Sequence, residues 1–303
     1  MLFQKKVFGG KKFVFLPLFF IKNIFLPLFI ILFHSNLFCN NQSNKSSFCK
    51  KTDKTFHIII PSYNAKNICE KTLQSILDQT YQKYRVYYLD DGSTDDTIKI
   101  AKNFLKNQSL ENRKKFILKK FYKNKGSVER LYQSICSLKD KDIVIYFEGN
   151  CFFPKKDILQ KLNEKFTKNN AWLVYGQDIE LSSQKKGVTR FFTSQNLFTN
   201  SMRWKNWKRA RIKSFYVGLF KKIKVQDLFF RAKFISEIFD SYYMFPLMEM
   251  TPDEKICFIK KPIISYSKKD EFIDKKRSCN KSYIKCKQRL IRATPYSEIR
   301  SEE

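Results

Sequence analysis

Three short polar clusters each follow an apolar segment of the chain, and their residue types are those of a ligand site. They are Pro61-Ser62-Tyr63-Asn64, Asp90-Asp91-Gly92-Ser93 and Glu148-Gly149-Asn150. The second cluster places two carboxylates side by side, which folding tolerates poorly unless a base, a ribose or a metal ion satisfies them. In open α/β sheets, ligands bind just beyond the carboxyl ends of the strands. We therefore expect the three clusters to form one crevice.

The segments around these clusters alternate between strand-like and helical patterns. Apolar runs predict strands over 56–60, 84–89, 115–121, 143–147 and 171–175, and periodic apolar residues predict helices over 127–136 and 156–167. Asn64 and Ser93 are expected to cap two more helices, the second with Asp95 and Asp96 in its first turn, where the helix dipole favours negative charge. This alternation predicts an α/β fold with a mostly parallel sheet.

Length and composition are those of a folded domain. Of 303 residues, 43% are hydrophobic and 31 are Phe, which is too apolar for disorder and sufficient for one α/β domain of roughly 230–260 residues. The net charge of +31 raises the possibility of a nucleic-acid partner. Lys is scattered, however, it rises together with Asn, Ile and Phe, and no nucleic-acid-binding motif is present. We therefore expect no nucleic-acid partner, although a basic surface favours anionic ligands and membranes.

The cysteines and histidines do not form a metal-site or triad pattern. The eight cysteines include no CxxC pair, and the two histidines, His34 and His57, lie apart. Most cysteines are interpreted as small hydrophobic residues in a reducing compartment. Cys39 and Cys49, beside the apolar N-terminus, are left open.

Residues 1–38 form a basic and hydrophobic segment. An apolar run over 13–33 follows four Lys residues, and about 21 residues at 1.5 Å each reach roughly 31 Å, enough to cross a bilayer. A membrane anchor is expected, with a signal peptide as the alternative; Pro17 and Pro27 argue against a buried helix. Similar numbers of Lys on both sides leave the orientation open. Residues 39–55 have the composition of a polar linker.

The clusters and the segments between them resemble the start of glycosyltransferase family 2, whose members have the GT-A fold. The resemblance rests on three motifs at matching separations: Ile58-Ile-Ile-Pro-Ser-Tyr-Asn64, Thr72-Leu-Gln-Ser-Ile-Leu-Asp-Gln-Thr80 and Asp90-Asp-Gly-Ser-Thr-Asp95. Later segments at 172–177, 215–228, 239–249 and 289–296 are similar to a bacterial membrane-associated or exported subgroup of that family. The resemblance implies a GT-A domain over 56–297, with a donor half at about 56–176, an acceptor half at about 177–297 and a tail over 298–303.

The resemblance further implies a nucleotide-sugar donor of the UDP or GDP type. Pro61 and Tyr63 would flank the base, and Asp91 would bond the base with support from Asp90. Arg130 stands where such enzymes commonly place an Asn near the donor phosphates; a phosphate contact and an ordinary exposed helix Arg both remain open. The residues expected to bind the donor are Pro61, Ser62, Tyr63, Asn64, Asp90, Asp91, Gly92, Arg130 and Glu148.

In that family the strand at 143–147 ends in a DXD-type motif, usually Asp-Gly-Asp-Asp, with one carboxylate binding a divalent cation that bridges the donor diphosphate. The matching residues here are Glu148, Gly149, Asn150 and Cys151. Glu148 and Asn150 offer oxygen ligands to Mg²⁺ or Mn²⁺, although with less charge, and Cys151 is a poor ligand for hard cations. We expect a metal site at Glu148 and Asn150 that is weakened, altered or lost relative to the family.

An inverting transferase needs a base that removes the proton of the acceptor hydroxyl. The subgroup's late carboxylate, which precedes a Met-Phe-Pro element, matches Asp240, and this residue is expected to be the base. Glu249 is a second acidic residue expected on the acceptor side. The segment 244–250 can equally be a turn of a core helix with Glu249 at its surface.

The expected function is sugar transfer from a nucleotide sugar to an acceptor hydroxyl with inversion; the acceptor, a glycan, lipid or protein, is not indicated. The altered motif at 148–151 keeps a second hypothesis open, a catalytically impaired homologue that binds nucleotide or glycan as a membrane-associated accessory protein. Nucleotide-sugar supply and unpaired cysteines favour the cytoplasmic face of a membrane, with export through a signal peptide as the alternative.

Overall fold

The computed structural model describes residues 7–8, 11–12, 53–187, 189, 191, 210–235, 240–267 and 281–299. The chain divides into two compact units, 1–44 and 45–303. In the first unit, β1 (Val7–Phe8) pairs antiparallel with β2 (Lys11–Lys12). The predicted apolar anchor over 13–33 lies outside the described residues. None of the helices that the structure describes combines the length and the apolar composition needed to cross a bilayer.

An eight-stranded sheet forms the centre of the second unit, in the spatial order β5-β4-β3-β6-β9-β8-β12-β7. The four strands β5, β4, β3 and β6 are parallel, as are β8 and β12, whereas β9 and β7 are antiparallel to their neighbours. The predicted α/β fold with a mostly parallel sheet is confirmed. The strands are β3 (Phe56–Ser62), β4 (Tyr84–Asp91), β5 (Phe116–Phe121), β6 (Ile143–Tyr146), β7 (Cys151–Phe152), β8 (Leu173–Glu180), β9 (Lys213–Tyr216) and β12 (Ile256–Tyr266).

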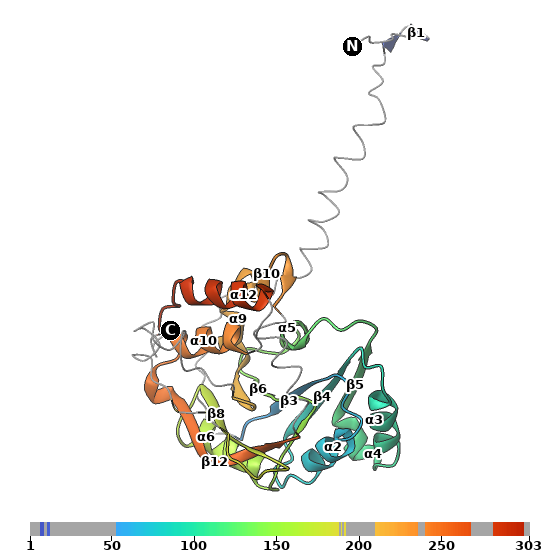
Figure 1. The fold of residues 1–303 in the computed structure, drawn as a ribbon, viewed down its shortest axis with the longest axis vertical. Coiled ribbons are helices and arrows are strands. Elements are labelled where there is room, and N and C mark those ends of the chain that lie inside the picture. Colours follow the sequence, from blue (N-terminus) through green and yellow to red (C-terminus); the bar gives the residue numbers. More distant parts are fainter. Residues whose placement is uncertain are drawn as a thin grey trace. The chain divides into compact units, whose positions relative to one another are not determined.

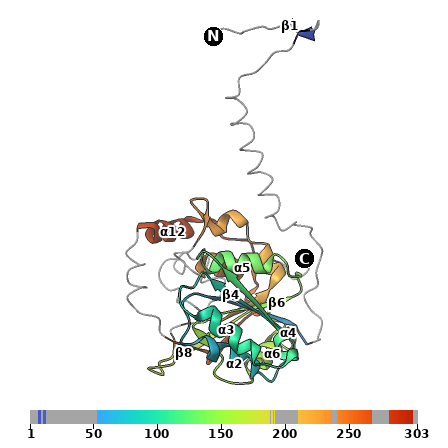
Figure 2. The ribbon, with the colours of Figure 1, turned by 90° about the vertical axis from the view of Figure 1, so that its right-hand side faces the viewer.

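Helices cover both faces of this sheet. On one face lie α2, α3, α4 and α6, and on the other lie α5, α9, α10 and α12 (Figure 1). The view turned by 90° separates α5 and α12 from α2, α3 and α6 in the same way (Figure 2). The helix bounds are α2 (Cys69–Leu77), α3 (Thr97–Lys106), α4 (Leu110–Lys114), α5 (Ser127–Ile135), α6 (Ile158–Thr167), α9 (Val217–Lys221), α10 (Ser241–Met250) and α12 (Lys281–Arg292), with 3-10 turns η2 (Val225–Leu228) and η3 (Asp253–Lys255).

The parallel half of the sheet is buried on both faces, which explains its continuous apolar runs. Ile58, Ile59 and Ile60 of β3 are all buried, and so is every residue of β6. α2 presents one buried stripe to this core through Cys69, Leu73 and Ile76. Cys69 is one of five cysteines among the described residues, all of them free thiols.

Two predicted helix caps are wrong. α2 begins at Cys69 rather than beside Asn64, and α3 begins at Thr97, after the cap position Asp96 rather than after Ser93. Asn64 instead adopts a positive φ of 48° and accepts a hydrogen bond from the Thr94 amide through its side chain. The Asn64 and Ser93 side chains each accept a hydrogen bond from the other's loop instead of capping a helix. The local sequence does not reveal such a partner.

The acceptor half contains a helix that is buried on all sides. All ten residues of α10 are buried, including Pro246 and Glu249. The core-helix alternative for 244–250 is therefore confirmed, but its expectation that Glu249 lies at the surface is wrong. A small hairpin of β10 (Phe229–Phe230) and β11 (Lys233–Phe234) extends from η2 and contacts α5 through Phe234 and Tyr132, whose ring centres are 5.3 Å apart.

Candidate donor site at the strand ends

The end of β3 and the turn that follows β6 are packed directly against each other. The Gly149 amide donates to the Pro61 carbonyl at 3.0 Å, and Ser62 Oγ lies 2.9 Å from the Tyr88 hydroxyl. A Cβ on Gly149 would lie 2.4 Å from Ser62 Oγ, so a side chain at this position would force the two segments apart. The close approach holds Glu148 beside the end of β3.

The loops after β3 and β4 are also joined to each other. The Asn64 amide donates to Ser93 Oγ at 3.0 Å, and the Thr94 amide donates to Asn64 Oδ1 at 2.9 Å. Tyr63 lies in the chain between the end of β3 and Asn64, and its side chain is 40% exposed. An aromatic ring held on a fixed loop and open to solvent can stack on a planar ligand.

Asp91 holds the turn that leads into α5. Its carboxylate accepts from the Gly126 amide at 2.8 Å, from the Lys125 amide at 3.2 Å and from Arg130 Nε at 2.6 Å. Gly92, with a φ of +78°, allows this turn to approach, because a Cβ there would lie 2.9 Å from the Asn124 amide nitrogen. Asp91 therefore links the end of β4 to the N-terminus of α5.

Arg130 is an internal residue. It is 2% exposed, and its guanidinium also donates to the Lys123 carbonyl at 2.8 Å and lies 3.5 Å from the centre of the Phe121 ring. The alternative of an ordinary exposed helix Arg is therefore wrong. The side chain neutralises Asp91 and closes the 123–126 turn, so its positive charge is already engaged within the chain.

Asp90 lies beside Asp91 in a different environment. It is 0% exposed, and within the described part of the chain neither carboxylate oxygen has a hydrogen-bond partner. Burial raises the pKa of this carboxyl above its ordinary value of 3.8; the nearby Ser93 hydroxyl and amide counteract part of that rise without reaching hydrogen-bond geometry. A buried carboxylate without donors is rare, and such groups concentrate at functional sites.

These contacts join the three predicted clusters into one structure, which we call the donor rim: residues 61–64, 90–93, 123–126 and 148–150. Its parts follow the carboxyl ends of β3, β4, β5 and β6, which the parallel register places at one edge of the sheet, with Ser62 opposite Asp90 and Asp91 opposite Phe121. The expectation that the clusters come together is met. All predicted donor residues lie on the rim or, like Arg130, directly support it.

The predicted metal residues, Glu148 and Asn150, offer few ligands to a divalent cation. Glu148 is partly buried, while the Asn150 side chain is engaged within the chain: Nδ2 donates to the Ser267 carbonyl at 3.0 Å and Oδ1 lies 3.5 Å from Cys151 Sγ. Over the ranges that the structure describes, no group of three or more His, Cys, Asp or Glu side chains could hold a metal ion. One carboxylate and one engaged amide do not fit a cation site made by the chain alone.

The predicted base, Asp240, lies near the rim but inside the protein. It precedes α10, is buried, and its Oδ2 lies 3.0 Å from Lys213 Nζ. Lys213 pairs with Tyr146 in the β6/β9 register, and its Nζ is 4.9 Å from the centre of the Tyr146 ring. Because Tyr146 precedes Glu148 by two residues, the ion pair lies close to the end of β6.

Glu249, predicted on the acceptor side, is 0% exposed and accepts a hydrogen bond from the Tyr296 amide at 3.0 Å. It ties the C-terminal segment to α10. Nothing in this geometry supports substrate contact by Glu249.

Sequence reasoning missed Lys213, because a lysine in a chain with so many lysines does not stand out. The available signal was its position inside the apolar stretch from Ile212 to Val217, where a charged residue needs a buried partner. Asp178 was missed as well: it is buried on β8 and pairs with Arg211 at 2.9 Å. Burial raises the pKa of the Asp178 carboxyl, and the Arg211 charge opposes that rise.

Among curated proteins, the chain is 24% identical over 185 residues to a Campylobacter jejuni protein named GalNAc(5)-diNAcBac-PP-undecaprenol beta-1,3-glucosyltransferase, an alignment that covers 58% of this chain and 55% of that protein. It is 19% identical over 141 residues to protein CgeD of Bacillus subtilis, covering 46% of this chain and 33% of CgeD. The chain thus spans about a third to just over half the length of these relatives.

Solved structures show the same fold. The complex of Staphylococcus aureus TarS 1-349 with UDP-GlcNAc superposes with a TM-score of 0.56 at 15% identity, covering 78% of this chain and 65% of TarS. Mycobacterium tuberculosis glucosyl-3-phosphoglycerate synthase, solved with Mn²⁺, UDP and phosphoglyceric acid, superposes with a TM-score of 0.51 at 15% identity, covering 80% of each chain. At this identity the likeness shows the GT-A fold alone.

The family model named Glycosyl transferase family 2 matches residues 57–232, which is more than half of the chain and includes the whole donor rim. The chain therefore belongs to glycosyltransferase family 2.

Proposed function

We propose that this protein transfers a sugar from a nucleotide-sugar donor to an acceptor hydroxyl, with inversion at the anomeric carbon. The observation that carries the proposal is the donor rim, in which three motifs separated by up to about 85 residues are hydrogen-bonded into one edge of the sheet. Family membership and the complexes of TarS with UDP-GlcNAc and of the mycobacterial synthase with UDP support the same class of donor.

On this proposal the two aspartates of the rim have different tasks. Asp91 maintains the turn at 123–126 through backbone amides and Arg130, and so holds this part of the rim in place. Asp90 carries a negative charge at the end of β4 that no hydrogen-bond donor of the described residues satisfies, and the N–H and O–H groups of a nucleoside are donors of the kind that it lacks. Tyr63, exposed on the neighbouring loop, stacks on the base.

In the proposed transfer, the acceptor oxygen attacks the anomeric carbon as the bond from that carbon to the diphosphate oxygen breaks. The diphosphate leaves with the electron pair, and the acceptor proton passes to the base, Asp240. Lys213 keeps the carboxylate in place until an acceptor hydroxyl reaches it. The position of this ion pair beside Tyr146, at the end of β6, supports its placement next to the donor.

The predicted divalent cation stays outside this scheme, because the residues at 148–150 do not make a complete site. A cation could bind only with further oxygen ligands, such as those of a donor diphosphate, and Glu148 is then the carboxylate that would contact it. Substitution of Asn150 by Asp would add the charge that the motif lacks.

A second candidate function is that of a catalytically impaired accessory protein that binds nucleotide or glycan. The specific observation in its favour is that the Asn150 amide is engaged with Ser267 and Cys151 rather than turned toward a ligand. The structure of the rim serves this function equally well, since it concerns binding alone.

The test is donor hydrolysis by the purified full chain across a panel of UDP- and GDP-sugars, with Mg²⁺, Mn²⁺ or EDTA, measured as released nucleoside diphosphate. Turnover of at least one donor that Asp240→Asn abolishes supports the transferase. UDP binding without turnover of any donor supports the accessory protein instead. Asn150→Asp should raise turnover in Mn²⁺ and leave turnover in EDTA unchanged; equal turnover in both would exclude a weakened cation site.

We also propose that the N-terminal segment 1–38 holds the protein at a membrane, with the domain on the cytoplasmic face. The length and apolar character of 13–33 support this proposal. Resistance of the full chain to alkaline extraction from membranes, compared with a chain that begins at residue 45, tests it; equal release of both would contradict it.

A further inference from the structure

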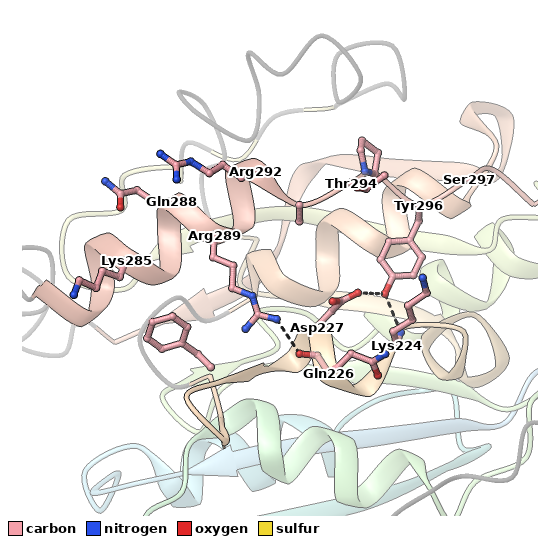
Figure 3. Close-up of a pocket in the computed structure, with 13 residues that line it drawn as sticks. Lys224, Gln226, Asp227, Lys285, Gln288, Arg289, Arg292, Thr294, Tyr296 and Ser297 are labelled. Carbon is pink, nitrogen blue, oxygen red and sulfur yellow. Dashed lines mark hydrogen bonds between the residues drawn. The ribbon is translucent and has the colours of Figure 1, made fainter.

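A large basic cavity lies outside the donor rim. It has a volume of about 1040 Å³ and is lined by η2, by α12 and by the segment 293–297 (Figure 3). The lining shares no residue with the donor rim. Ligand pockets for small molecules commonly have volumes of about 300–1,000 Å³, so this cavity can hold a ligand larger than a single phosphate ion.

Four basic side chains line the cavity against one acidic side chain. The basic residues are Lys224, Lys285, Arg289 and Arg292. The acid, Asp227, already accepts a hydrogen bond from the Tyr296 hydroxyl at 2.6 Å. Within the described ranges, no carboxylate forms an ion pair with Lys224, Lys285 or Arg292. The cavity therefore has an excess of positive charge.

The walls of the cavity are held in place by contacts that engage one of these four cations, Arg289, through its side chain. Arg289 donates to the carbonyl of Phe229 and, at 3.1 Å, to that of Gln226, which fixes α12 against η2. The Tyr296 hydroxyl accepts from the Lys224 amide at 2.8 Å (Figure 3). The Tyr296 amide donates to Glu249 of α10. The cavity is thus part of the folded domain.

The spacing along α12 explains why the charges gather there. Lys285, Arg289 and Arg292 recur at intervals of four and three residues and so lie along one side of the helix. Cys286 and Leu290 are buried on the other side. The helix packs through its apolar side, and its basic residues border the cavity.

We propose that this cavity binds a phosphate-bearing anion, as a site separate from the donor site. Guanidinium groups pair with phosphate through two parallel hydrogen bonds, and ammonium groups add charge without a fixed geometry. The phosphate can belong to a soluble ligand or to a lipid headgroup. The site does not depend on the proposed transfer, because no residue is shared between the two.

The experiment uses the full chain and sodium pyrophosphate as the soluble probe, with binding measured by calorimetry at low and high ionic strength. The test variant is Lys285→Gln with Arg292→Gln, since neither side chain makes a hydrogen bond or ion pair within the described residues. The matched control is Lys99→Gln with Lys102→Gln, two exposed lysines of α3 on the opposite face of the sheet. The test variant should bind pyrophosphate about tenfold more weakly, and the control should equal the native chain.

Two further arms distinguish the phosphate source and the location. Co-sedimentation with phosphatidylglycerol vesicles, compared with phosphatidylcholine vesicles, should be reduced by the test variant if the ligand is a lipid headgroup and unaffected if it is soluble. Glu148→Gln, on the donor rim, should not change the pyrophosphate binding that is weakened by the test variant. The proposal is overturned if the test variant binds both probes like the native chain, or if Glu148→Gln alone removes all pyrophosphate binding.

Discussion

The donor half and the acceptor half each contain a buried ion pair, and the two pairs differ in what surrounds them. Asp91 is bonded to Arg130 and also to two backbone amides of the 123–126 turn. Asp240 is bonded to Lys213, whose ammonium group lies 4.9 Å from the centre of the Tyr146 ring and 5.9 Å from that of Tyr243. Backbone amides cannot leave a turn without unfolding it, whereas a lysine side chain can rotate. The first pair therefore serves to hold structure, and the second can exchange its partner.

The largest expected effect concerns the second pair. Asp240→Asn should lower sugar transfer by about 10²–10⁴-fold, the range for loss of a general base, while UDP binding stays within a factor of two or so. The measurement is transfer rate alongside UDP affinity. Loss of the pair also leaves Lys213 buried without its acid, so the double variant Asp240→Asn with Lys213→Met is needed. If Asp240 acts only as an ion-pair partner, the double variant should recover transfer.

The first pair should dominate stability. Asp91→Asn should reduce the free energy of unfolding by about 3–5 kcal/mol, because Arg130 remains buried without its acid. Urea unfolding measures the change, and adding Arg130→Met should restore part of it. The exposed Asp96→Asn in the same loop is the control, with an expected change below about 0.5 kcal/mol. A loss for Asp91→Asn no larger than that of the control would contradict the structural role.

Ligand binding at the rim should depend on its exposed ring. Tyr63→Ala should weaken UDP binding about tenfold, in line with about 1–3 kcal/mol for stacking of a base on an aromatic side chain. Tyr122 is 99% exposed and lies outside the rim, so Tyr122→Ala should leave UDP affinity unchanged. Equal effects of the two substitutions would show that Tyr63 does not contact the base.

The smallest expected effect concerns Asp90 and depends on pH. Burial raises the pKa of this carboxyl above 3.8 in the folded chain, so the folded chain binds the proton more tightly than the unfolded chain. The stability of the folded chain therefore falls as the pH rises from the pKa of the unfolded chain through the higher pKa of the folded chain. Asp90→Asn should therefore be more stable than the native chain at neutral pH, by about 1 kcal/mol. The advantage should vanish at acid pH, below both pKa values. Urea unfolding over a pH series measures it, and an advantage that grows toward acid pH would contradict the assignment.

The positions of the strands and helices around the rim could be predicted from sequence within a few residues. β3, β6 and α5 lie where apolar runs and helical spacing indicated. A strand that is buried on both faces needs a continuous apolar run, and a helix packed against it needs apolar residues at helical spacing, so both patterns are visible in the sequence. The starts of α2 and α3 were misplaced. Asn64 and Ser93 bond to each other's loops, and a side chain's choice between a local and a distant donor depends on the fold.

The sequence by itself determined the family, the α/β fold and the set of residues at the strand ends, because strand order and motif spacing bring those residues to one edge of the sheet. Only the tertiary structure decided what each charge does. Arg130 pairs with Asp91 in the interior, and Lys213 pairs with Asp240, which is 27 residues away along the chain. Glu249 accepts a hydrogen bond from the Tyr296 amide. The interaction energy between two charged groups is small in water and large in the protein interior. The role of a charged residue therefore depends on its neighbours in space.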